Sequence, residues 1–439
     1  MLIEFQVANY RSFKERQVLS MVASADRSLP ANTFDVAGFG KRRLLKTAVV
    51  YGANASGKSN LINAIGFARA FIQSSANRRA DAEIRVSPFQ FAAETRSAPS
   101  EFEFNILIDG VRYQYGFAVD RRRVHREWLF AYPRGLPQKW FQRDSPSPDE
   151  TEWSWGAHLK GDKQRLARLT RPDMLFLSQA ANLEHEQLAH VHGWFGDELG
   201  VVDEGPNDAP MELFTSRVLM EDDHLQHGVA DLLRLADLGI DGFSIKPVNR
   251  SDITFDAEMP EGLRNALAEL VKQMEVVTDS SDPLRFNITM RHKLKGTDND
   301  VYLDLDDESL GTRRLFTLSG PLFQTLHHGG PLVVDELDSS LHPILVRELI
   351  RMFHNPATNP NNAQLIFNTH DTTLLDLDLF RRDQIWFVEK DSAGASHLYQ
   401  LLEFSPRKGE ALQKGYLAGR YGAIPFIGTP AWGIGHNGE

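Results

Sequence analysis

Apolar and polar residues alternate at the start of the chain, where Ile3, Phe5 and Val7 share one side of a predicted β-strand. Residues Thr47 to Tyr51 form a short apolar run that ends at a glycine-rich turn, which is typical of a buried strand. From Asn60 to Ser74 the apolar positions recur at helical spacing. The predicted order is therefore strand, glycine loop, helix.

The pattern changes three times further along the chain. From Glu101 to about Trp155 it is β-like, and Asp109-Gly110 predicts a tight hairpin turn. From about residue 156 to 280 helical spacing dominates, without the sustained heptads of a long coiled coil. Apolar strands then alternate with helical stretches, which is the rhythm of a parallel sheet.

These changes predict an α/β fold with a mostly parallel core sheet, an antiparallel β lobe and a helical insertion. We expect the two ends of the chain to build one head, because strand and helix alternation occurs at both ends. The expected parts are the first half of the head with its β lobe at 1–155, the helical insertion at 156–284, the second half of the head at 285–428 and a flexible tail at 429–439.

Composition narrows the classes of protein. The chain has 439 residues, no cysteine and a formal net charge of −11, so disulfides and thiolate metal sites are excluded. Neither an export signal nor an apolar stretch long enough to span a bilayer is recognisable, and we expect a cytoplasmic protein without a membrane partner. Any contact with DNA must be local. Its best candidate is Arg121 to Arg123 with Arg126, although a solvated turn is the favoured interpretation.

Residues Gly52 to Ser59 match the pattern G-x-x-x-x-G-K-[ST] in full. Such a loop turns its backbone N–H groups and a helix N-terminus toward phosphates. Lys58 is expected to reach the β- and γ-phosphates, and the Ser59 hydroxyl to bind Mg²⁺. A glycine turn without a nucleotide is the weaker alternative, because strand and helix flank the loop. The predicted nucleotide-binding residues are Gly52, Asn54, Ser56, Gly57, Lys58, Ser59 and Asn60.

Two acids follow the apolar strand at Pro331 to Val334. Asp335 would lie at the carboxyl edge of the sheet, beside the glycine loop, where it can hold Mg²⁺ through water. Glu336 points differently and is the candidate base that orients or deprotonates water. An acidic turn after a buried strand is the alternative. The nucleotide is expected to be ATP, because no guanine-reading Asn-Lys-x-Asp segment is present.

The segment Asp335-Glu336-Leu337-Asp338, followed by a predicted short helix, resembles the Walker B and D-loop of ABC, SMC, Rad50 and RecF ATPases. The resemblance implies that Asp338 lies at a dimer interface. A second apolar strand, Gln364 to Asn368, leads to His370, and the resemblance makes this residue the switch histidine that contacts the γ-phosphate and the attacking water. A structural histidine is the alternative.

The segment Glu308-Ser309-Leu310-Gly311-Thr312 looks like a degenerate form of the signature Leu-Ser-Gly-Gly-Gln. By this resemblance, Ser309 and Gly311 would bind the ATP held by the opposite subunit. The alternative is an ordinary serine cap at the start of a helix.

Two further segments resemble motifs of these ATPases less specifically. Asn9-Tyr10-Arg11-Ser12-Phe13 resembles the N-terminal segment of RecF and SMC heads, in which the arginine lies near the nucleotide, so Arg11 is a candidate nucleotide-binding residue. A solvated turn is equally compatible with this segment. Gln90 occupies the place of a Q-loop glutamine that would join Mg²⁺.

The motifs together, with Gly415-Tyr416-Leu417-Ala418-Gly419 near the end, resemble the AAA-type, RecF/OLD-like ATPases of bacterial abortive-infection and phage-defence operons. The resemblance covers roughly 1–130 and 285–428, and too few residues follow Asp383 for a Toprim nuclease domain. It implies an ATPase that forms a homodimer or higher homo-oligomer around ATP and Mg²⁺. Its implied role is to sense a trigger, such as DNA or a phage protein, and to regulate a co-encoded toxic effector.

Three other functions remain open at this point. One is a RecF-like ATPase that binds DNA for repair or maintenance. Another is the nucleotide-binding subunit of a transporter, which the incomplete signature disfavours. The last is a nuclease in its own right, which the missing Toprim domain disfavours.

Overall fold

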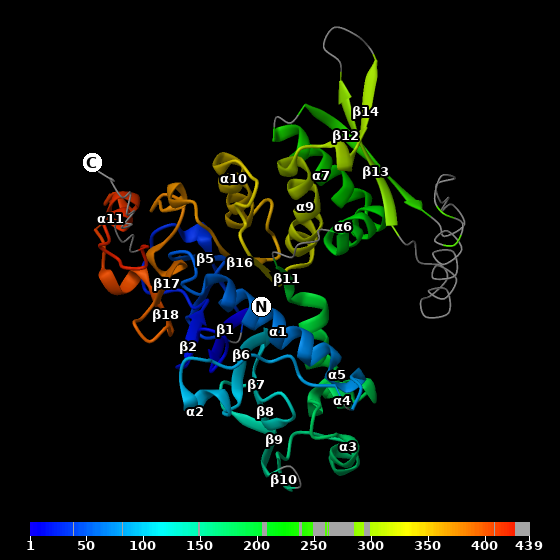
Figure 1. Ribbon diagram of the computed structural model, residues 1–439, viewed down its shortest axis with the longest axis vertical. Coiled ribbons are helices and arrows are strands. Elements are labelled where there is room, and N and C mark those ends of the chain that lie inside the picture. Colours follow the sequence, from blue (N-terminus) through cyan, green and yellow to red (C-terminus); the bar gives the residue numbers. More distant parts are fainter. Residues whose placement is uncertain are drawn as a thin grey trace, which may run out of the picture. The chain divides into compact units, whose positions relative to one another are not determined.

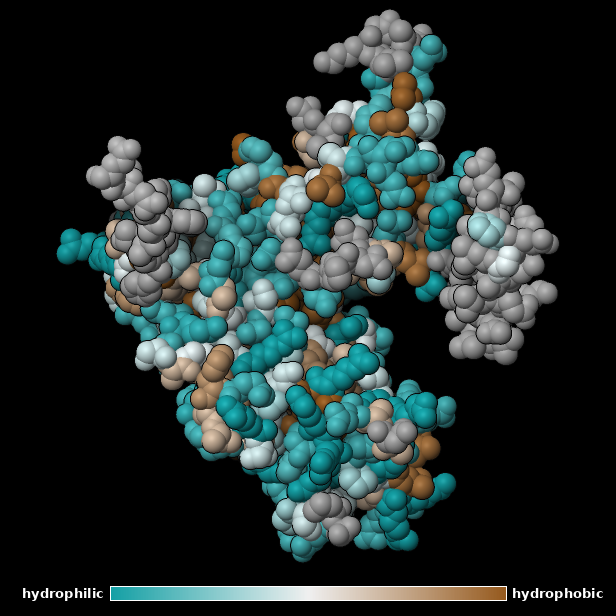
Figure 2. All heavy atoms as spheres, viewed as in Figure 1, coloured by the Kyte–Doolittle hydropathy of each residue, from teal (hydrophilic) through white to brown (hydrophobic). Residues whose placement is uncertain are grey.

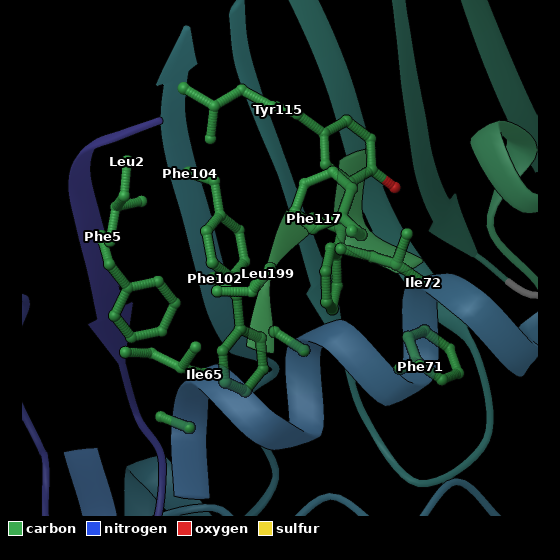
Figure 3. Packing of buried hydrophobic residues seen from close by; sticks show 14 of the residues in the cluster. Leu2, Phe5, Ile65, Phe71, Ile72, Phe102, Phe104, Tyr115, Phe117 and Leu199 are labelled. Carbon is green, nitrogen blue, oxygen red and sulfur yellow. The ribbon is translucent and has the colours of Figure 1, made fainter. Parts of the chain in front are cut away.

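In the computed structural model, the helix that follows the glycine loop, α1 (Lys58–Ser74), packs against two different β-sheets (Figures 1 and 3). Apolar side chains on several sides of this helix are buried, which explains its long run of apolar positions. The structure describes residues 1–37, 39–80, 82–147, 150–203, 209–236, 239–248, 260, 262, 285–293, 299–407 and 409–425. The tail expected at 429–439 lies outside these residues.

The core sheet has the strand order β11-β15-β16-β5-β17-β18. All neighbouring strands are parallel except β17 and β18, which form an antiparallel pair. The predicted α/β fold with a mostly parallel core sheet is confirmed. The strands are β5 (Thr47–Tyr51), β11 (Gly200–Val202), β15 (Pro331–Val334), β16 (Gln364–Asn368), β17 (Ile385–Lys390) and β18 (Ser396–Gln400).

The predicted antiparallel β lobe is confirmed as a sheet of order β10-β9-β8-β7-β6-β1-β2. Its central hairpin turns at Asp109 and Gly110, which have φ angles of 48° and 75°, as the Asp-Gly signal requires. The strands are β1 (Leu2–Ala8), β2 (Gln17–Ser20), β6 (Ser100–Ile108), β7 (Val111–Val119), β8 (Val124–Tyr132), β9 (Gln138–Ser147) and β10 (Glu150–Trp155). A further pair joins β3 (Thr33–Asp35) to β4 (Arg43–Leu45).

One hydrophobic core joins the two sheets through α1. Phe102 and Phe117 of the β lobe lie over the helix, close to Ile65 and Phe71 (Figure 3). The sheets are also linked by Gln364, whose side chain accepts a hydrogen bond from the N–H of Leu2 at 2.7 Å and donates one to its carbonyl oxygen at 3.0 Å. The two sheets are therefore joined both by apolar packing and by hydrogen bonds.

Helices complete both parts of the chain. Glu127 of β8 is fully buried and accepts hydrogen bonds from the N–H groups of Phe176 and Leu177, so it fastens the start of α4 to the β lobe. The helices in chain order are α2 (Ala93–Arg96), α3 (Lys163–Leu169), α4 (Phe176–Asn182), α5 (Glu186–Gly193), α6 (Ala209–Glu221), α7 (Asp223–Leu235), α9 (Leu310–His328), α10 (Pro343–His354) and α11 (Leu412–Leu417).

The chain divides into two compact units. Unit 1 comprises Met1–Glu204, His328–Asp338 and Val346–Glu439, and unit 2 comprises Gly205–His327 and Ser339–Leu345. Within unit 2 an antiparallel sheet joins β12 (Ile240–Val248), β13 (Arg285–Lys293) and β14 (Asp300–Asp304). Both sheets of the head belong to unit 1.

This division differs from the boundaries expected for the helical insertion at 156–284. Residues 156–204 belong to unit 1, because Ser178 of α4 donates to the carbonyl oxygen of Ile72 and its hydroxyl also accepts from Ser75 at the end of α1. Residues 285–327 belong to unit 2, because β13 pairs with β12. Unit 2 is thus mixed α/β in its described part. None of the helices among the described residues is both long and apolar enough to cross a membrane.

Candidate functional site

The glycine loop connects the end of β5 to the start of α1. Gly57 has a φ of 116°, and a β-carbon at this position would collide with the hydroxyl groups of Ser12 and Ser396. At Gly52 a β-carbon would collide with the carbonyl oxygen of Val388. Glycine is therefore the residue that fits at these two positions of the loop.

Lys58 begins α1 and is buried, and its ammonium group lies over the loop. It donates hydrogen bonds to the carbonyl oxygens of Gly52 at 2.9 Å and Ala53 at 3.2 Å. Burial lowers the pKa of Lys58, and the nearby carboxylates of Glu336, Asp335 and Asp338 oppose this shift. The acidic residues are therefore close enough to influence the lysine electrostatically.

Asp335 and Glu336 follow β15 at its carboxyl end, as the sequence predicts. Asp335 is buried, and desolvation together with the charge of Glu336 raises its pKa, whereas hydrogen bonds with Asn368 and Ser59 and the charge of Lys58 oppose the rise. Ser59 and Asp335 thus lie within hydrogen-bond reach of each other. They offer hard oxygen ligands, which suit Mg²⁺.

Asn368 holds these two acids in place, and it is a residue that the sequence interpretation missed. Its side-chain N–H group donates to Asp335 Oδ1, and its Oδ1 accepts from the backbone N–H of Glu336 at 2.7 Å. Glu336 has a φ of 48°, in the left-handed region that costs energy for a residue with a side chain. The amide of Asn368 therefore helps to maintain a strained backbone at Glu336 and binds the carboxylate of Asp335 at the same time.

Glu336 and His370 lie together in the cleft above the loop. His370 Nε2 is 3.5 Å from Glu336 Oε1, and the backbone N–H of His370 donates to Asp338 Oδ2 at 3.3 Å. The cleft has a volume of about 430 Å³. It is lined by Asn54, Ala55, Gly57, Lys58, Ser59, Asn60, Glu336, His370 and Lys390.

The structure therefore gathers most of the predicted residues of the head in one place. Gly52 and Ser56 do not line the cleft, and Ser56 Oγ is buried without a hydrogen-bond partner among the described residues. Asp338 also lies outside the lining, and its Oδ1 is buried without such a partner. These residues contribute to the loop and to the turn after β15.

Arg11 is linked to the cleft through Asn60, which is one of the lining residues. Its Nη1 donates to Asn60 Oδ1 at 3.4 Å, and Asn60 in turn donates to the hydroxyl of Ser12 at 2.7 Å. Arg11 has a φ of 48°, and its backbone N–H donates to the carbonyl oxygen of Ser87 at 2.7 Å. The segment from Asn9 to Phe13 is thus built against α1, which distinguishes it from a free solvated turn.

Gln90 is not brought to the cleft. Its side chain donates to the carbonyl oxygen of Pro88 at 2.8 Å and lines a different cavity of the β lobe, so the structure does not place it with Ser59 and Asp335 as the resemblance implied. The reason is local: Asn9 accepts from the N–H of Phe89 at 3.0 Å and donates to the carbonyl oxygen of Thr95 at 2.9 Å, which fixes this segment against β1.

Three further residues support the glycine loop, and the sequence interpretation missed their roles. Ser396 of β18 donates to the carbonyl oxygen of Ser56, and its backbone N–H donates to the carbonyl oxygen of Ser12 at 2.7 Å. Lys390, at the end of β17, adds a second cation to the lining of the cleft. Ser396 and Lys390 carry no local sequence signal, because strand pairing brings Ser396 to the loop and Lys390 to the cleft. Ser12 belongs to the Asn9–Phe13 motif, from which the sequence predicted a role for Arg11 alone.

Unit 2 contains the candidate signature, Ser309 and Gly311. The hydroxyl of Ser309 accepts a hydrogen bond from the backbone N–H of Thr312 at 3.1 Å, so Ser309 caps the start of α9. A β-carbon on Gly311 would lie 2.8 Å from the carbonyl oxygen of Ser340. Both residues thus have a structural reason within one chain, besides the role that the resemblance implies.

The fold and the cleft together define an α/β protein with a P-loop of the nucleotide-binding type. A family model described as "AAA domain, putative AbiEii toxin, Type IV TA system" matches residues 48–170 and 225–376. This match spans more than half of the chain, and the chain belongs to that family of AAA-domain proteins.

Solved structures of SMC heads are also similar to the chain. An SMC head domain from Thermotoga maritima has 13% identity and a TM-score of 0.38, and the match covers 91% of this chain and 98% of that chain. An SMC head bound to the C-terminal winged-helix domain of ScpA has 14% identity and a TM-score of 0.38, with 91% and 97% covered. A head from Pyrococcus furiosus with an extended coiled coil, bound to the C-terminal domain of ScpA, has 13% identity and a TM-score of 0.37, with 92% and 97% covered. Among curated proteins no relative matches.

Proposed function

We propose that the chain hydrolyses ATP in the cleft above the glycine loop and uses the bound nucleotide to close two copies into a dimer. The observation that carries this proposal is the meeting of Glu336 and His370, 3.5 Å apart, in the cleft that also contains Lys58. The carboxylate of Glu336, the imidazole of His370 and the ammonium group of Lys58 come from three separate segments of the sequence. Phosphoryl transfer to water can use all three groups.

Each residue has a role that its position supports. Lys58 and the N–H groups of the loop bind the β- and γ-phosphates. Glu336 accepts a proton from the attacking water while the water oxygen bonds to the γ-phosphorus, and the bond to the bridging oxygen breaks to release ADP. His370 donates a hydrogen bond to the γ-phosphate. Ser59 and Asp335 would hold Mg²⁺, which neutralises charge on the phosphates when it is bound.

The dimer follows from the signature in unit 2. In this proposal Ser309 and Gly311 of one copy contact the γ-phosphate in the other copy, and Asp338 lies where the copies meet. Nucleotide occupancy then sets the fraction of closed dimer, because ATP binds the closed state more tightly. Hydrolysis reopens it.

The first experiment is the molar mass of the Glu336→Gln variant, measured by light scattering with and without ATP and Mg²⁺. This variant keeps the shape of the side chain and removes the base, so we expect ATP to remain bound and the mass to double. The matched measurement with ADP should leave the mass unchanged. An unchanged mass with ATP demonstrably bound would refute dimer closure, and hydrolysis at an unchanged rate would refute the role of Glu336.

The biological role that we propose is the regulation of a co-encoded toxic effector in anti-phage defence. It is supported by the family description, which names a toxin and a toxin–antitoxin system. The trapped Glu336→Gln protein should retain the effector in a pull-down from cells that express both, and the effector should be released after phage infection. An ATP-dependent complex with DNA that weakens steeply with salt, without any effector, would favour a RecF-like function instead.

A further inference from the structure

A second cavity lies in the β lobe, separate from the lining of the nucleotide cleft. It has a volume of about 420 Å³ and lies where β6 begins and β7 ends. Three arginines line it, Arg96, Arg121 and Arg122, together with Gln90 and Ser97. Figure 2 shows that the face of the β lobe turned toward the viewer carries mostly hydrophilic side chains.

The single carboxylate in the lining is already used by its neighbours. Asp120 Oδ1 accepts hydrogen bonds from the backbone N–H groups of Arg122 and Arg123 at 2.7 and 2.8 Å. Asp120 Oδ2 lies 2.8 Å from His125 Nε2. This carboxylate therefore shapes the turn between β7 and β8 and does not pair with the guanidinium groups of the cavity.

The arginine side chains retain donors for a ligand. Arg121 and Arg122 are exposed, and within the described part of the chain their side chains have neither an ion pair nor a hydrogen bond. Arg96 donates through Nε to the carbonyl oxygen of Gln90 at 2.8 Å, which orients the group and leaves its two terminal nitrogens without a described partner. Three cations that are not paired with a carboxylate of the described residues repel one another, and a bound anion would relieve that repulsion.

The backbone around the cavity is fixed. The carbonyl oxygen of Arg121 accepts from the N–H of Ile84 at 2.8 Å, and Val119 pairs with Ser100 across the sheet. Asn9 binds the carbonyl oxygens of Thr95 and Ala98, both at 2.9 Å, which holds the short helix that carries Arg96. A preformed frame lowers the entropic cost of binding.

The surroundings extend the positive charge. One residue pair further along the sheet from Ser100 and Val119, Arg16 and Arg126 both pair with the single carboxylate of Glu101. This leaves one positive charge in excess. This concentration of arginine occurs in a chain whose formal net charge is −11. A local field of this kind selects anions although the whole protein repels them.

The chemistry of the lining indicates which anion. Guanidinium groups bind phosphate oxygens through two parallel hydrogen bonds, and three of them match a ligand with more than one phosphate group. The volume suits a small molecule. No aromatic side chain is among the described lining residues, and proteins that bind single-stranded nucleic acid usually stack its bases on such side chains.

We propose that this arginine-lined cavity binds a small ligand that carries two or more phosphate groups, independently of the nucleotide in the glycine-loop cleft. The turn at Asp120 to Arg123 supplies two of the cations, and α2 supplies the third. The ligand is recognised by its negative charge and by the spacing of its phosphate groups.

The test is calorimetric titration of inorganic pyrophosphate into the Lys58→Ala variant, in which the glycine loop no longer competes for phosphate. Adding Arg122→Ala should weaken the affinity at least about tenfold, because a charge-assisted hydrogen-bond pair is lost. The control Arg134→Ala removes another exposed arginine, from the turn after β8, and should leave the affinity unchanged. The Lys58→Ala protein and its derivatives with Arg122→Ala or Arg134→Ala should have the same melting temperature.

Parallel titrations with inorganic phosphate and with ADP distinguish a polyphosphate group from a single phosphate. We expect pyrophosphate and ADP to bind and phosphate to bind at least about tenfold more weakly. Pyrophosphate binding that survives Arg121→Ala with Arg122→Ala, or no pyrophosphate binding in the Lys58→Ala protein, would overturn the proposal. It would also be overturned if a short single-stranded oligonucleotide bound at these arginines and pyrophosphate did not.

Discussion

The side chain of Asn368 donates a hydrogen bond to the carboxylate of Asp335 and accepts one from the backbone of the following acid. Replacing Asn368 by Leu keeps the volume and removes both bonds. We expect ATP turnover to fall about 10- to 100-fold, because Asp335 loses its orienting partner. Steady-state turnover at saturating ATP is the measurement.

The Asn368→Leu result needs a separate check on folding and binding. ATP affinity, measured without turnover at low temperature, should change less than the turnover, since the glycine loop is untouched. Loss of cooperative thermal unfolding would assign the effect to folding, and unchanged turnover would contradict the positioning role of Asn368.

Ser396 braces the glycine loop through the carbonyl oxygen of Ser56. Ser396→Ala should weaken ATP binding roughly three- to tenfold, because the loop loses one hydrogen bond and part of its preorganisation. The control is Ser392→Ala, an exposed serine in the turn between the same two strands. Equal affinities of the two variants for a fluorescent ATP analogue would argue against the brace.

The sequence predicted the parts of the site that local pattern controls. The glycine loop needs a strand before it and a helix after it, and both have clear periodicity, so Lys58 and Ser59 could be placed in advance. Asp335 and His370 could be placed because the carboxyl ends of parallel strands share one edge.

The remaining site residues act through tertiary contacts. Lys390 reaches the cleft and Ser396 reaches the glycine loop because β17 lies beside β5 and β18 lies beside β17, an order that no short motif encodes. Gln90 is the opposite case. The family motif assigns it to Mg²⁺, whereas the hydrogen bonds of Asn9 fix its segment beside the separate cavity of the β lobe. Strand β12 was hidden among helical patterns, since its partner β13 is distant in the sequence.

His354 provides a pH-dependent test of the core. It is buried against Thr47, with His354 Nε2 2.9 Å from Thr47 Oγ1, and burial with the charge of Lys46 lowers its pKa from 6.5 to about 3. The folded chain thus keeps His354 neutral while the unfolded chain binds a proton below pH 6.5. Its contribution to stability is complete above this pH and is lost as the pH falls toward 3, with a slope of about 1.4 kcal/mol per pH unit.

The His354→Gln variant should therefore lose less stability on acidification over this range than the parent protein, although it is less stable at pH 7. Urea unfolding at a series of pH values gives both curves. Parallel curves would show that His354 does not titrate in this way.

Lys390 is the second cation in the lining of the nucleotide cleft. Lys390→Ala should lower ATP affinity roughly three- to tenfold, because an exposed charge contributes modestly to phosphate binding. Turnover at saturating ATP should change less than the affinity. Lys160→Ala, an exposed lysine outside the cleft, is the control for net charge. If both variants bind ATP equally, Lys390 takes no part in binding.

Ser309 allows the dimer to be tested without damage to unit 2. Its hydroxyl caps α9, and Gly311 is packed against Ser340, so Ser309→Ala and Gly311→Ala would each disturb the fold. Aspartate is also a good N-cap, and Ser309→Asp should therefore preserve the helix while it places a negative charge where the proposed dimer requires the γ-phosphate of the partner. We expect the Glu336→Gln, Ser309→Asp protein to bind ATP and to remain monomeric by light scattering. A full ATP-dependent increase in mass would mean that Ser309 serves only as a helix cap, and the dimer would then need a different interface.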